Sequence, residues 1–240
     1  MTRNLLGTNL IINQSNNSFS LDTILLSSFC HPRLTTNNIL DIGTGIGTIP
    51  LYLSTKTNAK IVGVEIQESL SNEAVCNVYL NHLNKQIEII NGDITHVYRE
   101  LPKFDLIVCN PPYFKTTHLS FMNKNNSKSV IRHEDILSLI SLFCVSNYLL
   151  KNRGQLFIIH RANRLEEIID IAKNNDFAVK TMCFIHSYLH SEAKHVLLEF
   201  QKNANIGLKV LPPIILYQSK HVFSNRLKLI YENINNFYII

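Results

Sequence analysis

The sequence lacks tryptophan, and no run of apolar residues in it is long enough to cross a bilayer. Its first residues contain no sustained apolar stretch followed by small residues, so we expect no secretory signal, a cytoplasmic location and no membrane partner. The five cysteines are scattered and form no C-x-x-C pair, which argues against zinc or dithiol redox chemistry. The ten histidines show no metal-ligand spacing, and we therefore expect no metal site.

Charged residues are also few, at 17% of the chain, and the formal net charge is only +5. This mild excess of positive charge permits a nucleic-acid partner but does not require one. Apolar residues make up 45% of the 240 positions, which is enough for one large α/β domain with a well-buried core. No linker, internal repeat or change of composition divides the chain, so we predict a single domain over residues 1–240.

Short runs rich in β-branched residues alternate with segments of helical periodicity. The predicted strands are residues 39–42, 59–66, 86–90, 104–109 and 155–160. The predicted helices are residues 21–29, 69–83, 134–150 and 165–174, with another that begins near Thr48. Such alternation predicts a parallel sheet that is covered by helices on both faces.

Two further strand-like runs, residues 177–186 and 195–200, are joined by a short polar segment. Since no helix separates them, we expect them to pair as an antiparallel hairpin.

Residues 115–132 are the most polar interior segment, and we interpret them as a mobile surface loop. Within the single domain we distinguish three parts, which are an N-terminal segment (1–36), a core (37–203) and a C-terminal tail (204–240).

The stretch DIGTGIG, residues 41–47, directly follows the first predicted strand and leads into a helix. Glycines at such a position let the chain turn sharply and let a ligand approach the main chain closely. The third glycine of the dinucleotide-binding pattern G-x-G-x-x-G would fall at Thr48, so the match to that pattern is incomplete. By itself, the stretch is compatible with either a structural turn or a ligand site.

Four polar residues lie at the ends of four successive predicted strands: Asp41, Glu65, Asp93 and Asn110. Ligands of open α/β sheets bind at the carboxyl ends of the strands, so we expect these side chains to meet at one edge. At the end of the second strand, Glu65 can accept hydrogen bonds from both hydroxyls of a ribose. The pattern therefore predicts a nucleoside-binding edge.

The motifs DIGTGIG, GVEI, NGDI and NPPY occur in this order and make the sequence resemble the class I S-adenosyl-L-methionine-dependent methyltransferases. The resemblance implies a Rossmann-like α/β fold with a seven-stranded, mostly parallel sheet, an antiparallel last strand and helices on both faces. It also implies S-adenosyl-L-methionine as the cofactor. The cofactor-binding residues would then be Asp22, Asp41, Gly43, Thr44, Gly45, Gly47, Glu65, Ile66, Asp93, Ile94 and Asn110.

The stretch NPPYF, residues 110–114, ends the fourth strand with two prolines that cannot donate to a sheet ladder. A methyl acceptor must present its lone pair in line with the S–CH₃ bond, and the lone pair of an amino group on a base is delocalised. The Asn110 side-chain oxygen and the Pro111 carbonyl can accept both N–H hydrogens, and Tyr113 can stack on the planar group. We therefore predict Asn110, Pro111, Pro112 and Tyr113 as catalytic residues. Residues 110–114 therefore favour a planar nitrogen as the methyl acceptor. They do not distinguish among adenine N6, cytosine N4, guanine N2 and a glutamine amide.

Three further segments narrow the resemblance to one family. They are FSLDTILL (19–26), FIIHRANRLEEI (157–168) and IILYQ (214–218). With the motifs above, they make nearly the whole chain similar to the bacterial tRNA adenine-N6 methyltransferases that modify the adenine next to the anticodon of a valine tRNA. This resemblance implies a tRNA partner that is recognised at its anticodon loop, and we expect a monomer. It also implies that Asp22 and the segment 1–36 close over the methionine end of the cofactor.

The substrate-binding residues in this interpretation are Tyr113, Phe114, Lys115, Lys124, Lys128 and Arg132. The four cations could contact tRNA phosphates, although a solvated loop explains them equally well. A glutamine-N5 methyltransferase of the release-factor type shares NPPY but is expected to carry a separate helical domain, for which the first 36 residues are too few. Another NPPY-type rRNA or DNA amino methyltransferase, or an RNA-binding module without activity, stays open as well.

Overall fold

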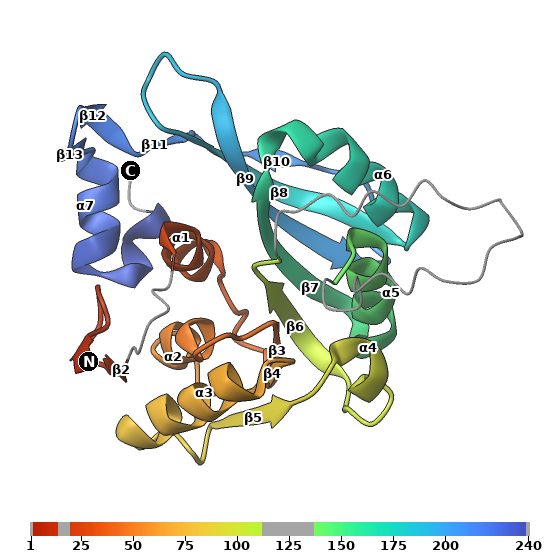
Figure 1. The fold of residues 1–240 in the computed structure, drawn as a ribbon. Helices are drawn as coiled ribbons and strands as arrows, with labels where there is room; N and C mark the ends of the chain where they lie inside the picture. Colours follow the sequence, from red (N-terminus) through yellow and green to blue (C-terminus); the bar gives the residue numbers. More distant parts are fainter. Residues whose placement is uncertain (1, 14–19, 112–136, 239–240) are drawn as a thin grey trace, which may run out of the picture.

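Nine strands form one central sheet in the computed structural model of this chain, which describes residues 2–13, 20–111 and 137–238 (Figure 1). The strands are β3 (Asn38–Ile42), β4 (Lys60–Glu65), β5 (Ile87–Asn91), β6 (Phe104–Cys109), β7 (Leu150–Arg161), β8 (Phe177–His186), β9 (Ala193–Lys202), β10 (Lys209–Val210) and β11 (Ile214–Ile215). Their order across the sheet is β10-β8-β9-β7-β6-β3-β4-β5, and β11 pairs separately with β8. All strands predicted from the sequence are present in this sheet.

The sheet is mostly parallel, because β3 to β7 all run in one direction. Strand β9 lies between β7 and β8 and is antiparallel to both, which confirms the predicted hairpin and the antiparallel late strand. The sheet has two strands more than the predicted seven, since β10 and β11 pair with the outer edge of β8. Each contains only two residues, too few for a recognisable pattern, and together they cover part of an edge strand that would otherwise be open to other chains.

Helices cover both faces of the sheet, as predicted. One face carries α1 (Leu21–Phe29), α2 (Thr48–Ser54), α3 (Glu68–Leu80) and α7 (Asn225–Glu232), and the other carries α4 (Ile94–Val97), α5 (Leu139–Leu149) and α6 (Leu165–Asn174). Alternate residues of β6 belong to the two cores, with Leu106 and Val108 in one and Ile107 and Cys109 in the other. Burial on both faces explains why the central strands are continuous apolar runs in the sequence.

Two helix boundaries differ from the prediction by more than one residue. Helix α3 ends at Leu80 instead of residue 83, because His82 adopts a left-handed backbone conformation that a helix cannot continue through. Helix α5 begins at Leu139 instead of residue 134, because Ser138 is extended and its hydroxyl accepts the Ser141 N–H at 3.1 Å. Helices α1 and α6 span the predicted residues.

The two ends of the chain form elements that the sequence pattern did not predict. The N-terminal hairpin of β1 (Thr2–Asn4) and β2 (Ile11–Asn13) is attached to α3 by side-chain amides, including Asn77 Oδ1, which accepts the Asn13 N–H at 2.7 Å. The C-terminal segment adds the hairpin of β12 (Tyr217–Ser219) and β13 (Val222–Phe223), then α7 and the 3₁₀ helix η2 (Ile234–Tyr238). Phe237 of η2 packs on Phe29 of α1 with ring centroids 5.3 Å apart, so residues 204–240 contribute to the core.

Within the described residues, no helix is both long enough and apolar enough to cross a membrane. The longest of these helices, α3, has 13 residues.

Candidate active site

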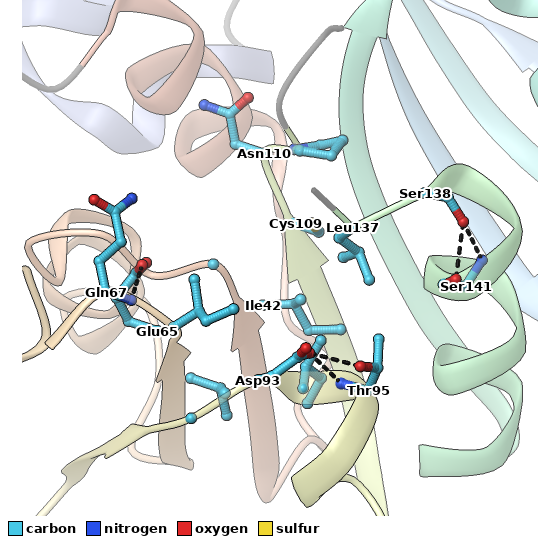
Figure 2. A pocket seen from close by; sticks show the side chains of 16 residues that line it. Ile42, Glu65, Gln67, Asp93, Thr95, Cys109, Asn110, Leu137, Ser138 and Ser141 are labelled. Carbon is cyan, nitrogen blue, oxygen red and sulfur yellow. Dashed lines mark hydrogen bonds between the residues drawn. The ribbon is translucent and has the colours of Figure 1, made fainter. Parts of the chain in front are cut away.

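A cavity of about 490 Å³ opens at the carboxyl ends of β3, β4, β5 and β6 (Figure 2). Figure 2 shows Glu65 and Gln67 on one side of it, Asn110 at the end of β6, and Ser138 and Ser141 on the opposite side. A second cavity of about 260 Å³ adjoins it below the start of α1, and Gly43 and Asn110 line both. The strand ends therefore meet at one edge, as predicted from the sequence.

Glu65 connects the glycine turn to the start of α3. Its Oε2 accepts the N–H of Gly45 at 2.8 Å, and its Oε1 accepts the N–H of Gln67 at 3.0 Å. The side chain lines the larger cavity, although only 5% of the residue is exposed. Each carboxylate oxygen can accept two hydrogen bonds, so the group retains acceptor capacity toward a ligand.

The glycines of the turn have two different roles in the local geometry. Gly43 and Gly45 adopt φ angles of +73° and +57°, and a Cβ at either position would meet no atom within 4 Å. Open space therefore lies against the main chain there, where a ligand can approach it. Gly47 also has a positive φ, of +83°, but a Cβ there would lie 3.2 Å from the Ala74 Cβ of α3. Its lack of a side chain is thus explained by helix packing, and it lines neither cavity.

Asp41 lies beneath the glycine turn and does not line either cavity. It is fully buried, and neither its carboxylate oxygens nor the Thr44 hydroxyl has a hydrogen-bond partner among the described residues. Burial raises the pKa of Asp41 to about 7, the nearby Thr44 hydroxyl lowers it in part, and the Glu65 carboxylate raises it. Unsatisfied buried polar atoms of this kind are costly to folding and are a feature of ligand sites.

Asp93 begins the short helix α4 and lines the larger cavity. Its Oδ1 accepts hydrogen bonds from the Thr95 N–H at 2.8 Å and from the Thr95 hydroxyl at 2.7 Å. The apolar side chains of Ile66 and Ile94 line the same cavity. This side of the cavity thus offers a carboxylate beside an apolar surface, which suits a planar heterocycle with polar edges.

Asn110 follows the last residue of β6 and is partly exposed. Its Nδ2 donates to the Thr23 hydroxyl of α1 at 3.1 Å, and the buried Pro111 follows it in the cavity wall. The neighbouring Cys109 is buried, and burial together with the Asp41 charge raises the pKa of its thiol well above the usual value. The thiol is therefore protonated near neutral pH and is a poor nucleophile.

Several predicted site residues lie outside the described residues or away from both cavities. The residues outside are Pro112, Tyr113, Phe114, Lys115, Lys124, Lys128 and Arg132. Asp22 is in the first turn of α1 and lines neither cavity, and its Oδ1 lies 3.9 Å from the Nδ1 of His195. The described parts of the chain contain no group of three His, Cys, Asp or Glu side chains that could hold a metal ion.

The sequence pattern missed several residues that line the two cavities. They include Ser20, Thr23, Gln67, Thr95, Ser138 and Ser141. Ser20 and Ser138 cap helices, which is a signal that hydroxyl residues before an apolar run can provide. The contact of Thr23 with Asn110 had no such signal, because the two residues are 87 positions apart.

Comparison with known proteins points to methyltransferases. The family model of the methyltransferase small domain matches residues 14–174. The chain is 33% identical over 203 residues to the tRNA1(Val) (adenine(37)-N6)-methyltransferase of Phocaeicola vulgatus, which covers 85% of this chain and 84% of that protein. It is 26% identical over 212 residues to the enzyme of the same name from Aliivibrio salmonicida, which covers 86% of this chain and 85% of that protein.

Solved structures share the fold. A predicted O-methyltransferase of Agrobacterium tumefaciens superposes with a TM-score of 0.69 and 20% identity, over 90% of this chain and 97% of that one. The ribosomal protein L11 methylase of Lactobacillus delbrueckii superposes with a TM-score of 0.54 and 17% identity, over 76% and 78%. At these identities the similarity concerns the fold alone.

Proposed function

The chain belongs to the methyltransferase small domain family, and we propose that it transfers a methyl group from S-adenosyl-L-methionine to N6 of an adenine in tRNA. We propose adenine 37 of tRNA1(Val) as the target, the nucleotide named for relatives that match most of this chain. The observation that carries the proposal is the cavity where Glu65, Asp93 and Asn110 meet. Glu65 provides a carboxylate suited to a ribose, Asp93 provides a carboxylate beside an apolar wall, and Asn110 provides an amide at the end of a strand.

The residues of the two cavities fit S-adenosyl-L-methionine. The open space over Gly43 and Gly45 accommodates a ligand against the main chain, and the buried Asp41 and Thr44 oxygens below it need a partner. In our proposal this turn holds the methionine and ribose part of the cofactor, and Glu65 accepts hydrogen bonds from the ribose hydroxyls.

At the other end of the larger cavity, Asp93 and Ile94 would hold the adenine of the cofactor, with Ile66 nearby. Ser20, which caps α1, and Thr23 in its first turn line the smaller cavity. The positions of Ser20 and Thr23 support a role for the N-terminal segment in closing over the methionine end, whereas Asp22 lines neither cavity.

The reaction requires little from the protein beyond binding and orientation. When bound, S-adenosyl-L-methionine would supply an electrophilic methyl group to N6 and leave as the neutral thioether, and N6 would lose one proton to water. Asn110 Oδ1 and the Pro111 carbonyl would accept the two N6 hydrogens, and these bonds strengthen as positive charge develops on the nitrogen. Thr23 would fix the plane of the Asn110 amide through the hydrogen bond at 3.1 Å.

We propose that the protein acts in the cytoplasm as a monomer. A tRNA substrate supports the location. The partner would be the anticodon arm of the tRNA, which carries the proposed target.

A methylation assay with two substrates tests this function. The protein is incubated with labelled S-adenosyl-L-methionine and either unmodified tRNA1(Val) or a release factor, and the product is identified by mass spectrometry. We expect label on adenine N6 of the tRNA, at position 37. Label on a glutamine of the release factor, or on no RNA, would contradict the proposal.

A further inference from the structure

Four aromatic rings form a continuous cluster between the β8–β9 turn, the β12–β13 hairpin and α7. We call Tyr188, Tyr217, Phe223 and Tyr231 the aromatic platform. Tyr188 lies 5.7 Å from Tyr217 at an interplanar angle of 37°, and Tyr217 stacks on Phe223 at 5.5 Å and 27°. Tyr231 of α7 completes the cluster edge-on to Phe223 at 5.4 Å. Tyr217 and Phe223 thus form a stacked pair, and Tyr188 is tilted against Tyr217.

Packing of the hairpin alone does not require so much exposed aromatic surface. Tyr188 is 42% exposed and Phe223 is 36% exposed, and both are bordered by other exposed apolar side chains, Leu189 and Val222. A contiguous apolar patch on a surface is a common mark of a binding site. Flat rings at the exposed ends of a stack are suited to a further planar group.

Two lysines lie close in the sequence to residues of the aromatic platform, as do Glu192 of the β8–β9 turn and Glu232 of α7. Lys220 occupies the turn between Tyr217 and Phe223. Lys228 lies three residues before Tyr231 on α7, so Lys228 and Tyr231 share one side of that helix. Between residues 204 and 240, four Lys and Arg residues stand against a single carboxylate, Glu232. Aromatic rings together with cations are complementary to the bases and phosphates of a single-stranded nucleic acid.

A series of contacts leads from the candidate active site toward the aromatic platform. Asn110 contacts Thr23 of α1, and the adjacent Asp22 lies 3.9 Å from His195 of β9. From there the β8–β9 hairpin leads to the platform, where the Tyr217 N–H donates to the carbonyl of Ser187 at 3.0 Å. Figure 1 shows β12, β13 and α7 together on the side of α1 that faces away from β6, with the β8–β9 turn above them.

We propose that the aromatic platform binds unpaired nucleotides of the RNA whose adenine is methylated, an inference that rests on the proposed function. Unpaired bases of the anticodon loop next to the target adenine stack on Tyr188 and Phe223, and Lys220 and Lys228 contact the adjoining phosphates. The platform thus provides a second contact with the anticodon loop, outside the cavity that accepts the target base. It also assigns a role to the C-terminal segment.

Binding and methylation of an anticodon stem-loop RNA test the platform in the full-length protein. Dissociation constants are measured by fluorescence anisotropy for the unmodified stem-loop and for a duplex RNA of the same length without a loop. Tyr188→Ala and Phe223→Ala should each weaken stem-loop binding about 5- to 150-fold, as expected for the loss of base stacking, with much less effect on the duplex. The dissociation constant of S-adenosyl-L-methionine, measured by calorimetry, should not change.

Tyr148→Ala is the matched control. Tyr148 is 45% exposed, lies 5.0 Å from the Tyr98 ring and has the Lys103 ammonium 3.8 Å from its own ring centroid. It has the same chemistry as the platform but belongs to α5, on the other side of the molecule in Figure 1. We expect its removal to leave RNA binding unchanged. The double variant Lys220→Ala, Lys228→Ala changes only exposed side chains, so it tests the same surface without disturbing packing.

The outcomes separate this inference from the proposed function. If the wild-type protein methylates the stem-loop and the platform variants bind it as tightly as the wild type does, the platform inference is wrong and the function stands. If the wild-type protein neither binds nor methylates the stem-loop, both are wrong. Selective loss of loop binding in the aromatic variants and in the lysine double variant supports the platform.

Discussion

At the scale of single residues, the Asn110 amide is restrained from two sides. It stands at the end of a buried strand, is followed by proline, and donates to Thr23 from its nitrogen. Both features restrict how the amide can rotate, so its oxygen can be oriented before a substrate arrives. Preorganised acceptors of this kind stabilise developing charge without a cost of reorganisation during the reaction.

Asn110→Ala tests the proposed catalytic role. Removal of the acceptor should lower the rate of methyl transfer about 100- to 1000-fold, comparable with the loss of one preorganised hydrogen-bond partner in other enzymes. The affinity for S-adenosyl-L-methionine should change only a few-fold, because the glycine turn and Glu65 remain. Single-turnover methylation and calorimetry provide the two measurements. If cofactor affinity falls in parallel with the rate, Asn110 acts in cofactor binding instead.

Thr23 is proposed as a positioning residue for Asn110. Thr23→Val removes the hydroxyl that accepts the Asn110 N–H but keeps the shape of the side chain, so kcat should fall about tenfold. Thr23→Ser keeps the hydroxyl and should restore most of the rate. Steady-state kinetics with saturating cofactor gives kcat separately from KM. An unchanged kcat in the valine variant would contradict this role, because that variant lacks the hydrogen bond.

Asp41 should make stability depend on pH. Its pKa in the folded state, about 7, is above the ordinary value of 3.8, so the folded protein binds the extra proton between these pH values. This contribution to stability is complete below pH 4 and is lost as the pH rises through 7, by at most about 4 kcal/mol. Asp41→Asn should remove this pH dependence. Urea unfolding at pH 5 and pH 8 measures the difference in the free energy of unfolding between the two pH values. The same difference in the variant as in the wild type would contradict the assignment.

At the scale of elements, the C-terminal segment completes the core on one face of the sheet. Leu227 and Ile230 of α7 and Phe237 of η2 are all fully buried. Phe237 packs on Phe29, and the Phe29 ring in turn lies 5.6 Å from Phe157 of β7. The segment thus joins α1, which carries Thr23, to the centre of the sheet.

Phe237→Ala tests the contribution of this segment to stability. Loss of a fully buried phenylalanine should lower the free energy of unfolding by about 3–5 kcal/mol, since both burial and packing are lost. Leu229→Ala on α7 is a suitable control, because Leu229 is 37% exposed and its truncation should cost much less. Urea denaturation of the two variants compares them directly. Similar small effects in both would mean that the segment is only loosely attached.

At the scale of the whole molecule, the moderate net charge of +5 predicts RNA binding that depends on salt. The logarithm of the tRNA association constant should fall linearly with the logarithm of the salt concentration, by about 0.7–0.9 for each phosphate contact. Lys220→Ala should reduce this slope by about one contact, whereas Lys103→Ala, on the other side of the sheet, should not. Filter binding over a series of KCl concentrations measures the slopes. Equal slopes in the two variants would contradict a phosphate contact at Lys220.

The predictions from sequence succeeded where local pattern and global topology coincide. Apolar runs such as residues 104–109 mark strands buried on both faces, and the carboxyl ends of parallel strands necessarily meet at one edge. That is why Glu65, Asp93 and Asn110 could be grouped before their positions were known. The predicted start of α5 was wrong because helical periodicity extends back past Ser138, whereas the extended backbone and capping hydroxyl of Ser138 make the helix begin after it.

The sequence by itself determined the order of strands and helices, the glycine turn and the polar residue at each strand end, because these depend on short-range pattern and strand direction. Only the tertiary structure decided which distant side chains meet: Thr23 with Asn110, Asp22 with His195, and Tyr188 with Tyr217. It also separated Gly43 and Gly45, which face open space, from Gly47, which packs against α3. Contacts between residues far apart in the chain depend on how whole elements pack, and no local pattern records that packing.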